Sequence, residues 1–172
     1  MKVLIVEDDN KIAKLLQQGF LDAGFFADMT AEGSDGLKLA LSEEYDLLIV
    51  DVMLPGIDGF ALVEELRKQE KETPVIFLSA KRSKEDRIEG FKRGGDDYIV
   101  KPYSFSEVLV RAQTILKRTL KQNENTKIKF HDLELDLISR TVRRGKTEIE
   151  LHQKEFALLE YLLRNPEKVL SK

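Results

Sequence analysis

Short runs of apolar residues alternate with longer segments of helical periodicity through residues 1–120. The first apolar run, Val3 to Val6, is followed by a segment whose apolar residues recur every three or four positions until Gly24. This change of period predicts a strand followed by a helix, with Asn10 as the expected N-terminal cap and Gly24 as the stop.

The same alternation continues to the end of this region. Further strands are expected at Phe25 to Met29, Leu47 to Val50, Val75 to Leu78 and Tyr98 to Val100, and further helices around Leu37 to Leu41, from Gly59, from Ser83 and after the capping box Ser104-x-x-Glu107. Continuously apolar strands separated by helices are typical of a parallel sheet covered on both faces, because crossovers are right-handed. Residues 1–120 therefore predict a flavodoxin-like, doubly wound α/β domain with a five-stranded parallel sheet.

The pattern changes after this region. Residues 121–126 contain no apolar side chain and predict a linker. Beyond it, alternation from Leu133 to Leu137 and a turn signal at Gly145 predict a small antiparallel sheet, and a helix is expected from about Gln153 to Asn165. Residues 127–172 therefore predict a small, partial α+β segment.

Composition limits the classes of function. Apolar residues make up 42% and charged residues 34% of the chain, which fits a globular protein, and the net charge of -3 argues against general nucleic-acid affinity. No apolar run approaches the roughly 18 residues of a membrane span, so no membrane association and a cytoplasmic location are expected. With no cysteine and two histidines, any metal should be a hard ion bound by oxygens.

Polar residues stand at the downstream ends of four expected strands. Glu7 and Asp8 follow the first strand, Asp51 the third, Ser79 the fourth and Lys101 the fifth. In an open parallel sheet these ends meet at one crevice, so the five side chains are expected in one pocket. A single acid after a strand is more often a helix cap, but four strand ends with complementary groups form a specific signal.

The expected pocket suits phosphoryl chemistry. Two carboxylates about 4 Å apart repel by roughly 4 kcal/mol at an effective dielectric near 20, so a cation is needed, and Mg²⁺ fits such oxygen ligands. A carboxylate nucleophile, a divalent metal, a lysine and a hydroxyl can together stabilise a phosphoryl group on an aspartate. The predicted reaction is phosphoryl transfer to Asp51.

Four motifs carry a family resemblance. They are Val6-Glu7-Asp8, the segment from Asp51 to Gly59 (Asp-Val-Met-Leu-Pro-Gly-x-Asp-Gly), Leu78-Ser79-Ala80, and the segment from Gly94 to Tyr103 with its Lys101-Pro102. With these motifs the chain resembles two-component response regulators of the OmpR/PhoB type. The resemblance spans residues 1–120, which would be the receiver domain.

The resemblance implies a role for each pocket residue. Asp51 would accept a phosphoryl group from a sensor histidine kinase and Lys101 would pair with it. Ser79 would then turn to hydrogen-bond the phosphoryl oxygen, and Tyr98 would swing into the space it leaves. The implied Mg²⁺ ligands are Asp8, Asp51 and the backbone carbonyl of Met53, with Glu7 holding a metal-bound water.

The resemblance also implies a homodimer formed on phosphorylation through the fourth helix, fifth strand and fifth helix. The charges that would pair between subunits are Arg87 with Glu107, Asp97 with Arg111, and Asp96 with Arg118. Any single one of these pairs is better explained as ordinary solvated helix charges.

Residues 127–172 resemble the amino-terminal part of the family's winged-helix DNA-binding domain, with His152 where a threonine usually caps the helix. The recognition helix and wing that would follow are absent from this sequence, so promoter DNA binding is expected of a longer parent protein rather than of this chain. The alternative is a truncated phospho-receiver that acts through protein contacts. The small core is expected to be poorly closed, and so loose, packed on the receiver, or completed by another chain.

Two enzymatic alternatives fit less well. A phosphatase of the haloacid dehalogenase type needs a second acid two residues after its nucleophile, where this chain has Met53. A flavodoxin needs a glycine- and hydroxyl-rich phosphate loop after the first strand, where Glu7, Asp8 and Asp9 would repel the phosphate. The protein is therefore expected not to be an enzyme, apart from slow loss of its own phosphate.

Overall fold

The computed structural model describes residues 1–80, 83–122, 127–137 and 139–165 of the chain. Its N-terminal region contains β1 (Lys2–Val6), α1 (Asn10–Asp22), β2 (Phe26–Thr30), α2 (Gly33–Ser42), β3 (Leu47–Asp51), α3 (Gly59–Lys68), β4 (Val75–Ser79), α4 (Lys84–Lys92), β5 (Asp97–Val100) and α5 (Phe105–Gln122). None of the described helices is long and apolar enough to cross a bilayer.

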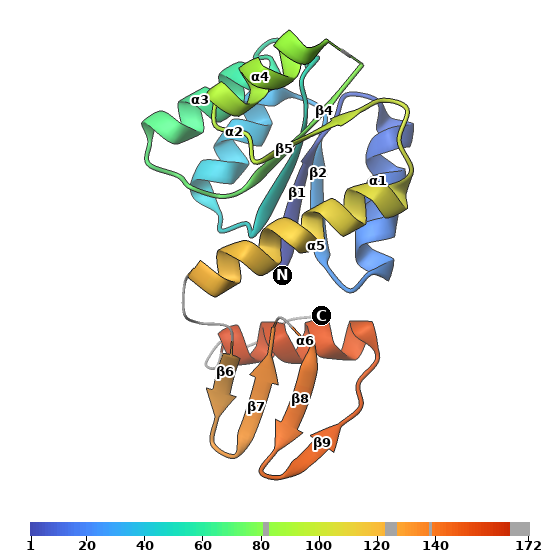
Figure 1. The fold of residues 1–172 in the computed structure, drawn as a ribbon, viewed down its shortest axis with the longest axis vertical. Coiled ribbons are helices and arrows are strands. Elements are labelled where there is room, and N and C mark those ends of the chain that lie inside the picture. The colour runs from blue at the N-terminus through green and yellow to red at the C-terminus, as the bar shows by residue number, and fades with distance from the viewer. Residues whose placement is uncertain (81–82, 123–126, 138, 166–172) are drawn as a thin grey trace.

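The five strands form one parallel sheet in the order β2-β1-β3-β4-β5, which confirms the doubly wound fold (Figure 1). Each face of the sheet carries its own core. Leu16, Phe20 and Val108 belong to the cluster formed with α1 and α5, whereas Leu62 and Val63 belong to the cluster formed with α2 and α3. Alternate strand residues supply the two clusters, as the two-residue period of a strand requires.

The start of α1 corrects one sequence prediction. The Oδ1 atom of Asp9, rather than Asn10, caps the helix, accepting from the backbone N–H of Lys11 at 2.8 Å and of Ile12 at 3.2 Å. Asn10 was a plausible cap because both residue types accept such bonds, and sequence alone does not separate neighbours. The helix ends at Asp22, and Gly24 follows with φ of +81°.

The C-terminal region contains an antiparallel sheet of β6 (Lys127–Phe130), β7 (Leu133–Asp136), β8 (Thr141–Arg144) and β9 (Thr147–Ile149), followed by α6 (Gln153–Arg164). Its core is small, with only Leu135, Leu137, Val142 and Phe156 buried among the described residues of the cluster. The edge strand β6 was not predicted. Of the predicted linker, residues 121–122 belong to α5, and residues 123–126 lie outside the described residues, as does the end of the chain from residue 166.

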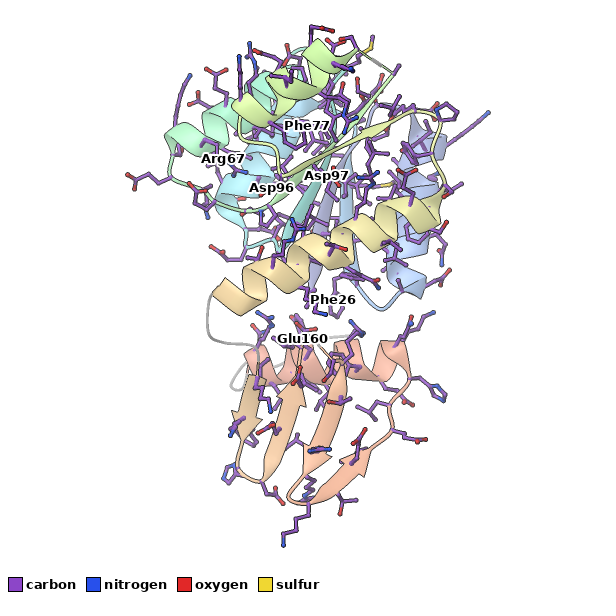
Figure 2. All side chains as sticks on the ribbon, in the orientation of Figure 1. Phe26, Arg67, Phe77, Asp96, Asp97 and Glu160 are labelled. Atoms are coloured by element: carbon purple, nitrogen blue, oxygen red, sulfur yellow. The ribbon has the colours of Figure 1, made fainter. Side chains whose placement is uncertain are left out.

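The C-terminal region packs on the N-terminal region, which is one of the three expected outcomes for its small core. The Met1 ammonium forms an ion pair with Glu160 Oε2 at 3.0 Å, and Glu160 is 0% exposed. The rings of Phe26 and Tyr161 lie 5.3 Å apart. Figure 2 shows Phe26 and Glu160 on facing sides of this contact. The chain's first residue thus partly covers the small core.

Candidate functional site

The structure brings the predicted pocket residues together at the carboxyl edge of the sheet. Asp51 and Ser79 are the last residues of β3 and β4, Glu7 follows β1, and Lys101 follows β5. The backbone N–H of Glu7 continues the strand ladder by donating to Thr30 O at 3.1 Å. Glu7 is 1% and Asp51 4% exposed, so two carboxyl groups are buried at one site.

Lys101 joins the two buried acids. Its Nζ donates to both carboxylate oxygens of Glu7, at 2.9 and 2.8 Å, and to Asp51 Oδ2 at 2.5 Å. An ammonium group has three donors, so these contacts use all of them. The other Asp51 oxygen, Oδ1, accepts from the backbone N–H of Met53 at 2.9 Å. The Asp51 carboxylate is therefore held at both oxygens.

The pocket residues divide between the two faces of the sheet. Ile5, Ile49 and Ile99 belong to the core cluster of α1 and α5, so Glu7, Asp51 and Lys101, each two residues further on, continue that face. Phe77 and Tyr98 belong to the opposite cluster, and Ser79 continues their face. Tyr98 is 3% exposed, so its ring is already buried in this structure. The backbone N–H of Lys101 donates to Ser79 O at 2.7 Å and links the two strand ends.

Three carboxylates at this edge can hold a divalent cation. Glu7, Asp8 and Asp51 each offer an oxygen, and these oxygens all lie within 4.8 Å of one another. Asp8 is exposed to solvent, which leaves an open side for water ligands. An all-oxygen donor set with an open side fits Mg²⁺, which keeps several waters when it binds.

Burial dominates the electrostatics of the pocket. Burial of the Glu7 carboxyl group, opposed by the hydrogen bonds from Lys101 and reinforced by the nearby charge of Asp51, raises its pKa to about 7. Burial by itself would lower the pKa of Lys101, yet its hydrogen bonds to Asp51 and Glu7 raise that pKa above its ordinary value. The lysine thus stays charged and partly neutralises an otherwise repulsive pair.

Several of the charges expected at a subunit interface have partners within this chain. Arg111 pairs with Asp97 at 3.0 Å and with Glu107 at 2.9 Å. Asp96 accepts from the backbone N–H of Val75 at 2.8 Å and lies 3.6 Å from Arg67, and Figure 2 shows Arg67, Asp96 and Asp97 near one another. The two remaining residues of the set, Arg87 and Arg118, are exposed.

Sequence reasoning gave no role to Tyr103, although this residue closes the fourth motif. Its hydroxyl oxygen is buried and has no hydrogen-bond partner among the residues that the structure describes. The signal available in the sequence was its place at the end of the fourth motif, and the structure packs it against the core cluster of α1 and α5. Burial of a single atom is not visible in a sequence, so the structure was needed to single it out.

A doubly wound sheet with three acids, a lysine and a buried serine at its carboxyl edge defines the class of receiver-type signalling domains. Residues 3–113 match the family model described as the response regulator receiver domain, and the chain belongs to this family. Members of the family act as signalling phosphoacceptors and not as enzymes with an external substrate. Response regulators of this type are phosphorylated by histidine kinases, and the full-length proteins bind DNA.

Curated relatives match nearly the whole chain. The probable transcriptional regulatory protein SilR of Salmonella typhimurium is 43% identical over 170 residues, covering 99% of this chain and 75% of that protein. The transcriptional regulatory protein CusR of Escherichia coli K12 is 42% identical over the same length, with the same coverage.

Solved structures agree with this assignment. The response regulator DrrB of Thermotoga maritima, described as an OmpR/PhoB homolog, has a TM-score of 0.61 and 31% identity over 98% of this chain and 75% of its own. The receiver domain of Francisella response regulator 1452 has a TM-score of 0.67 and 42% identity, covering 69% of this chain and 98% of its own.

Proposed function

We propose that this chain is the phosphorylation-controlled part of a transcriptional regulator, in which Asp51 accepts a phosphoryl group from a sensor histidine kinase. The observation that carries the proposal is the environment of the Asp51 carboxylate. It is buried, Lys101 Nζ lies 2.5 Å from its Oδ2, and it belongs to the acidic cluster with Glu7 and Asp8.

The proposed reaction transfers a phosphoryl group from a histidine nitrogen of the kinase to a carboxylate oxygen of Asp51. An Asp51 carboxylate oxygen attacks the phosphorus atom of a kinase phosphohistidine, and an O–P bond forms as the N–P bond breaks. The electron pair of the broken bond returns to the imidazole nitrogen, which takes a proton from solvent. Lys101 provides a fixed positive charge beside the oxygens on which negative charge accumulates. Slow hydrolysis of the resulting acyl phosphate would reset the protein.

We assign the metal to the three acids at the carboxyl edge. Asp8, Asp51 and the backbone carbonyl of Met53 would bind Mg²⁺ directly, and Glu7 would hold one of its waters. When bound, Mg²⁺ supplies positive charge to the phosphoryl oxygens. Met53 N–H and Lys101 Nζ would orient the phosphoryl group through Asp51, because each of them holds one oxygen of the Asp51 carboxylate.

Ser79 and Tyr98 would report the phosphorylation. Ser79 would turn to hydrogen-bond the phosphoryl oxygen, and the Tyr98 ring, which is already buried in this structure, would turn into the space that Ser79 leaves. A homodimer through α4, β5 and α5 would follow. Its expected pairs are Arg87 with Glu107, Asp97 with Arg111, and Asp96 with Arg118. Arg111, Asp97 and Glu107 would then exchange partners within the chain for partners in the second subunit.

The proposed division of the chain is a receiver at residues 1–120, a linker at residues 121–126, and the amino-terminal part of a winged-helix DNA-binding domain at residues 127–172. The transcriptional relatives support it, since they match the chain across all three parts. The regulator as a whole would act on promoter DNA in the cytoplasm.

Intact-mass analysis after treatment with acetyl phosphate and Mg²⁺ tests the proposal. The wild-type chain should gain the mass of one phosphoryl group, and Asp51→Asn should gain none. Asp58→Asn is the matched control, because Asp58 is exposed and caps α3 through Ala61 N–H, a role that asparagine also fills. The Asp58→Asn variant should react like the wild type. Equal phosphorylation of Asp51→Asn would refute the assignment of the acceptor.

A further inference from the structure

The hydroxyl of Tyr103 is a buried donor for which the described residues provide no acceptor. Its oxygen is shielded from solvent and has no hydrogen-bond partner in the described part of the chain. A buried hydroxyl normally has a partner, because leaving one without a hydrogen bond is unfavourable. A hydroxyl kept in this condition in one state of a switch protein suggests a partner in the other state.

Tyr103 lies on the face of the sheet that carries the acids. Its side chain packs against the core cluster that contains Ile5 and Ile49. Glu7 and Asp51 each follow one of these isoleucines by two residues and therefore lie on the same face of the sheet. Burial, together with the negative charges of Glu7 and Asp51, raises the pKa of Tyr103 above its ordinary value. The phenol therefore remains protonated, as a neutral donor in an acidic environment.

In the unphosphorylated protein Lys101 supplies a donor to each oxygen of the Glu7 carboxylate. The lysine ammonium gives two of its three donors to Glu7 and the third to Asp51. A phosphoryl group on Asp51 adds a charge of about -1.5 to -2 with strong acceptor oxygens. Donors that Lys101 turns toward that group are taken from Glu7, whose carboxyl group is 1% exposed, so apart from the metal-bound water proposed for it, solvent cannot replace them. A buried carboxylate that loses its donors needs another.

We propose that Tyr103 is a positioning residue for the phosphorylated state, whose hydroxyl donates to the Glu7 carboxylate when Lys101 turns to the phosphoryl group. This inference rests on the proposed phosphorylation of Asp51. Tyr103 would thus hold the acidic pocket in its phosphorylated arrangement without touching the phosphoryl group. In the free protein the same hydroxyl makes no hydrogen bond to any residue that the structure describes.

Removal of the hydroxyl in Tyr103→Phe should act with opposite sign on the two states. Binding of beryllofluoride with Mg²⁺, used as the phosphoryl mimic and followed by ¹⁹F NMR titration, should weaken about tenfold, which is about 1.4 kcal/mol. Without Mg²⁺ and beryllofluoride, the urea midpoint of Tyr103→Phe should equal or exceed that of the wild type. A purely structural hydroxyl would instead lower that midpoint. Tyr45→Phe is the control, since its hydroxyl donates to Asp28 Oδ2 at 2.9 Å, away from the pocket.

A second measurement observes the wild-type hydroxyl directly. The chain has four tyrosines and no tryptophan, so ultraviolet resonance Raman bands of tyrosine are free of indole overlap, and the Tyr103→Phe difference spectrum isolates Tyr103. Beryllofluoride with Mg²⁺ should convert this signal to that of a hydrogen-bond donor. An unchanged signal, or beryllofluoride binding by Tyr103→Phe within about twofold of the wild type, overturns the inference and leaves the proposed function intact. Failure of the wild type itself to bind beryllofluoride would reject the proposed function.

Discussion

Substitution of Glu7 by glutamine should change how the stability of the fold depends on pH. Burial of the Glu7 carboxyl group and the neighbouring Asp51 raise its pKa from an ordinary 4.5 to about 7. The folded protein therefore holds this proton more tightly than the unfolded chain. The contribution of Glu7 to the free energy of unfolding is fully present below pH 4.5 and is lost as the pH rises to about 7.

The size of the effect follows from the two pKa values. Each pH unit between 4.5 and about 7 corresponds to about 1.4 kcal/mol, so the loss is on the order of 3 kcal/mol. Solvent screening reduces it little, because Glu7 is 1% exposed. Glutamine has nearly the same shape and cannot ionise. Glu7→Gln should be within about 1 kcal/mol of the wild type near pH 5 and exceed its stability by up to about 3 kcal/mol near pH 8.

Urea unfolding at several pH values between 5 and 8.5, in EDTA to exclude metal, measures this difference. Glu44→Gln is the control, because the Glu44 side chain is 95% exposed and its ion pair with Lys71 contributes little. Its stability curve should run parallel to that of the wild type. If Glu7→Gln were also parallel, or less stable at pH 8, then attraction to Lys101 outweighs burial and the electrostatic reasoning is wrong.

Three further perturbations test other parts of the structure. Mg²⁺ at a hundredfold excess over its dissociation constant should raise the free energy of unfolding by about 2.7 kcal/mol in urea titrations, and an equal gain in Asp8→Asn would exclude Asp8 as a ligand. Gly59→Ala places a Cβ 2.1 Å from the backbone oxygen of Asp51, so the variant should lose about 1 to 3 kcal/mol of unfolding free energy and bind beryllofluoride more weakly. Unchanged binding would show that the end of β3 adapts to the added methyl group. Glu160→Ala removes the ion pairs of Glu160 with the Met1 ammonium and with Arg164, so amide exchange in α6 should quicken about tenfold while Mg²⁺ affinity stays constant, and unchanged exchange would show that these ion pairs do not hold α6 in place.

The fold could be predicted from the sequence because the strands of the parallel sheet consist almost entirely of apolar residues. β3 and β4 are buried at every position, so their apolar runs are continuous, and the intervening helices show a clear period. The pocket was predictable for the same reason. Once parallel strands are assigned, topology places Glu7, Asp51 and Lys101 at one edge without knowledge of any side-chain conformation.

Features that depend on single atoms or on three-dimensional packing could not be predicted. Asp9 and Asn10 are both good caps, and only the backbone geometry selects Asp9. β6 was missed because its side chains are mostly exposed, which removes the apolar alternation that identifies a strand. Packing of the C-terminal region on the N-terminal region was one of three open outcomes. It depends on a contact between Met1 and Glu160, which lie far apart in the sequence, and no local pattern reveals such a contact.

The division of the pocket between the two faces of the sheet suggests how a local charge change is transmitted. The charged chemistry of Glu7, Asp51 and Lys101 lies on the face of α1 and α5, whereas Ser79 and Tyr98 lie on the face of α2 and α3. The backbone hydrogen bond from Lys101 N–H to Ser79 O links the ends of β4 and β5. A displacement of the Lys101 backbone would therefore act on the Ser79 end of β4. Because Tyr98 is on β5 only three residues before Lys101, the same displacement would extend along β5 toward the surface of α4, β5 and α5.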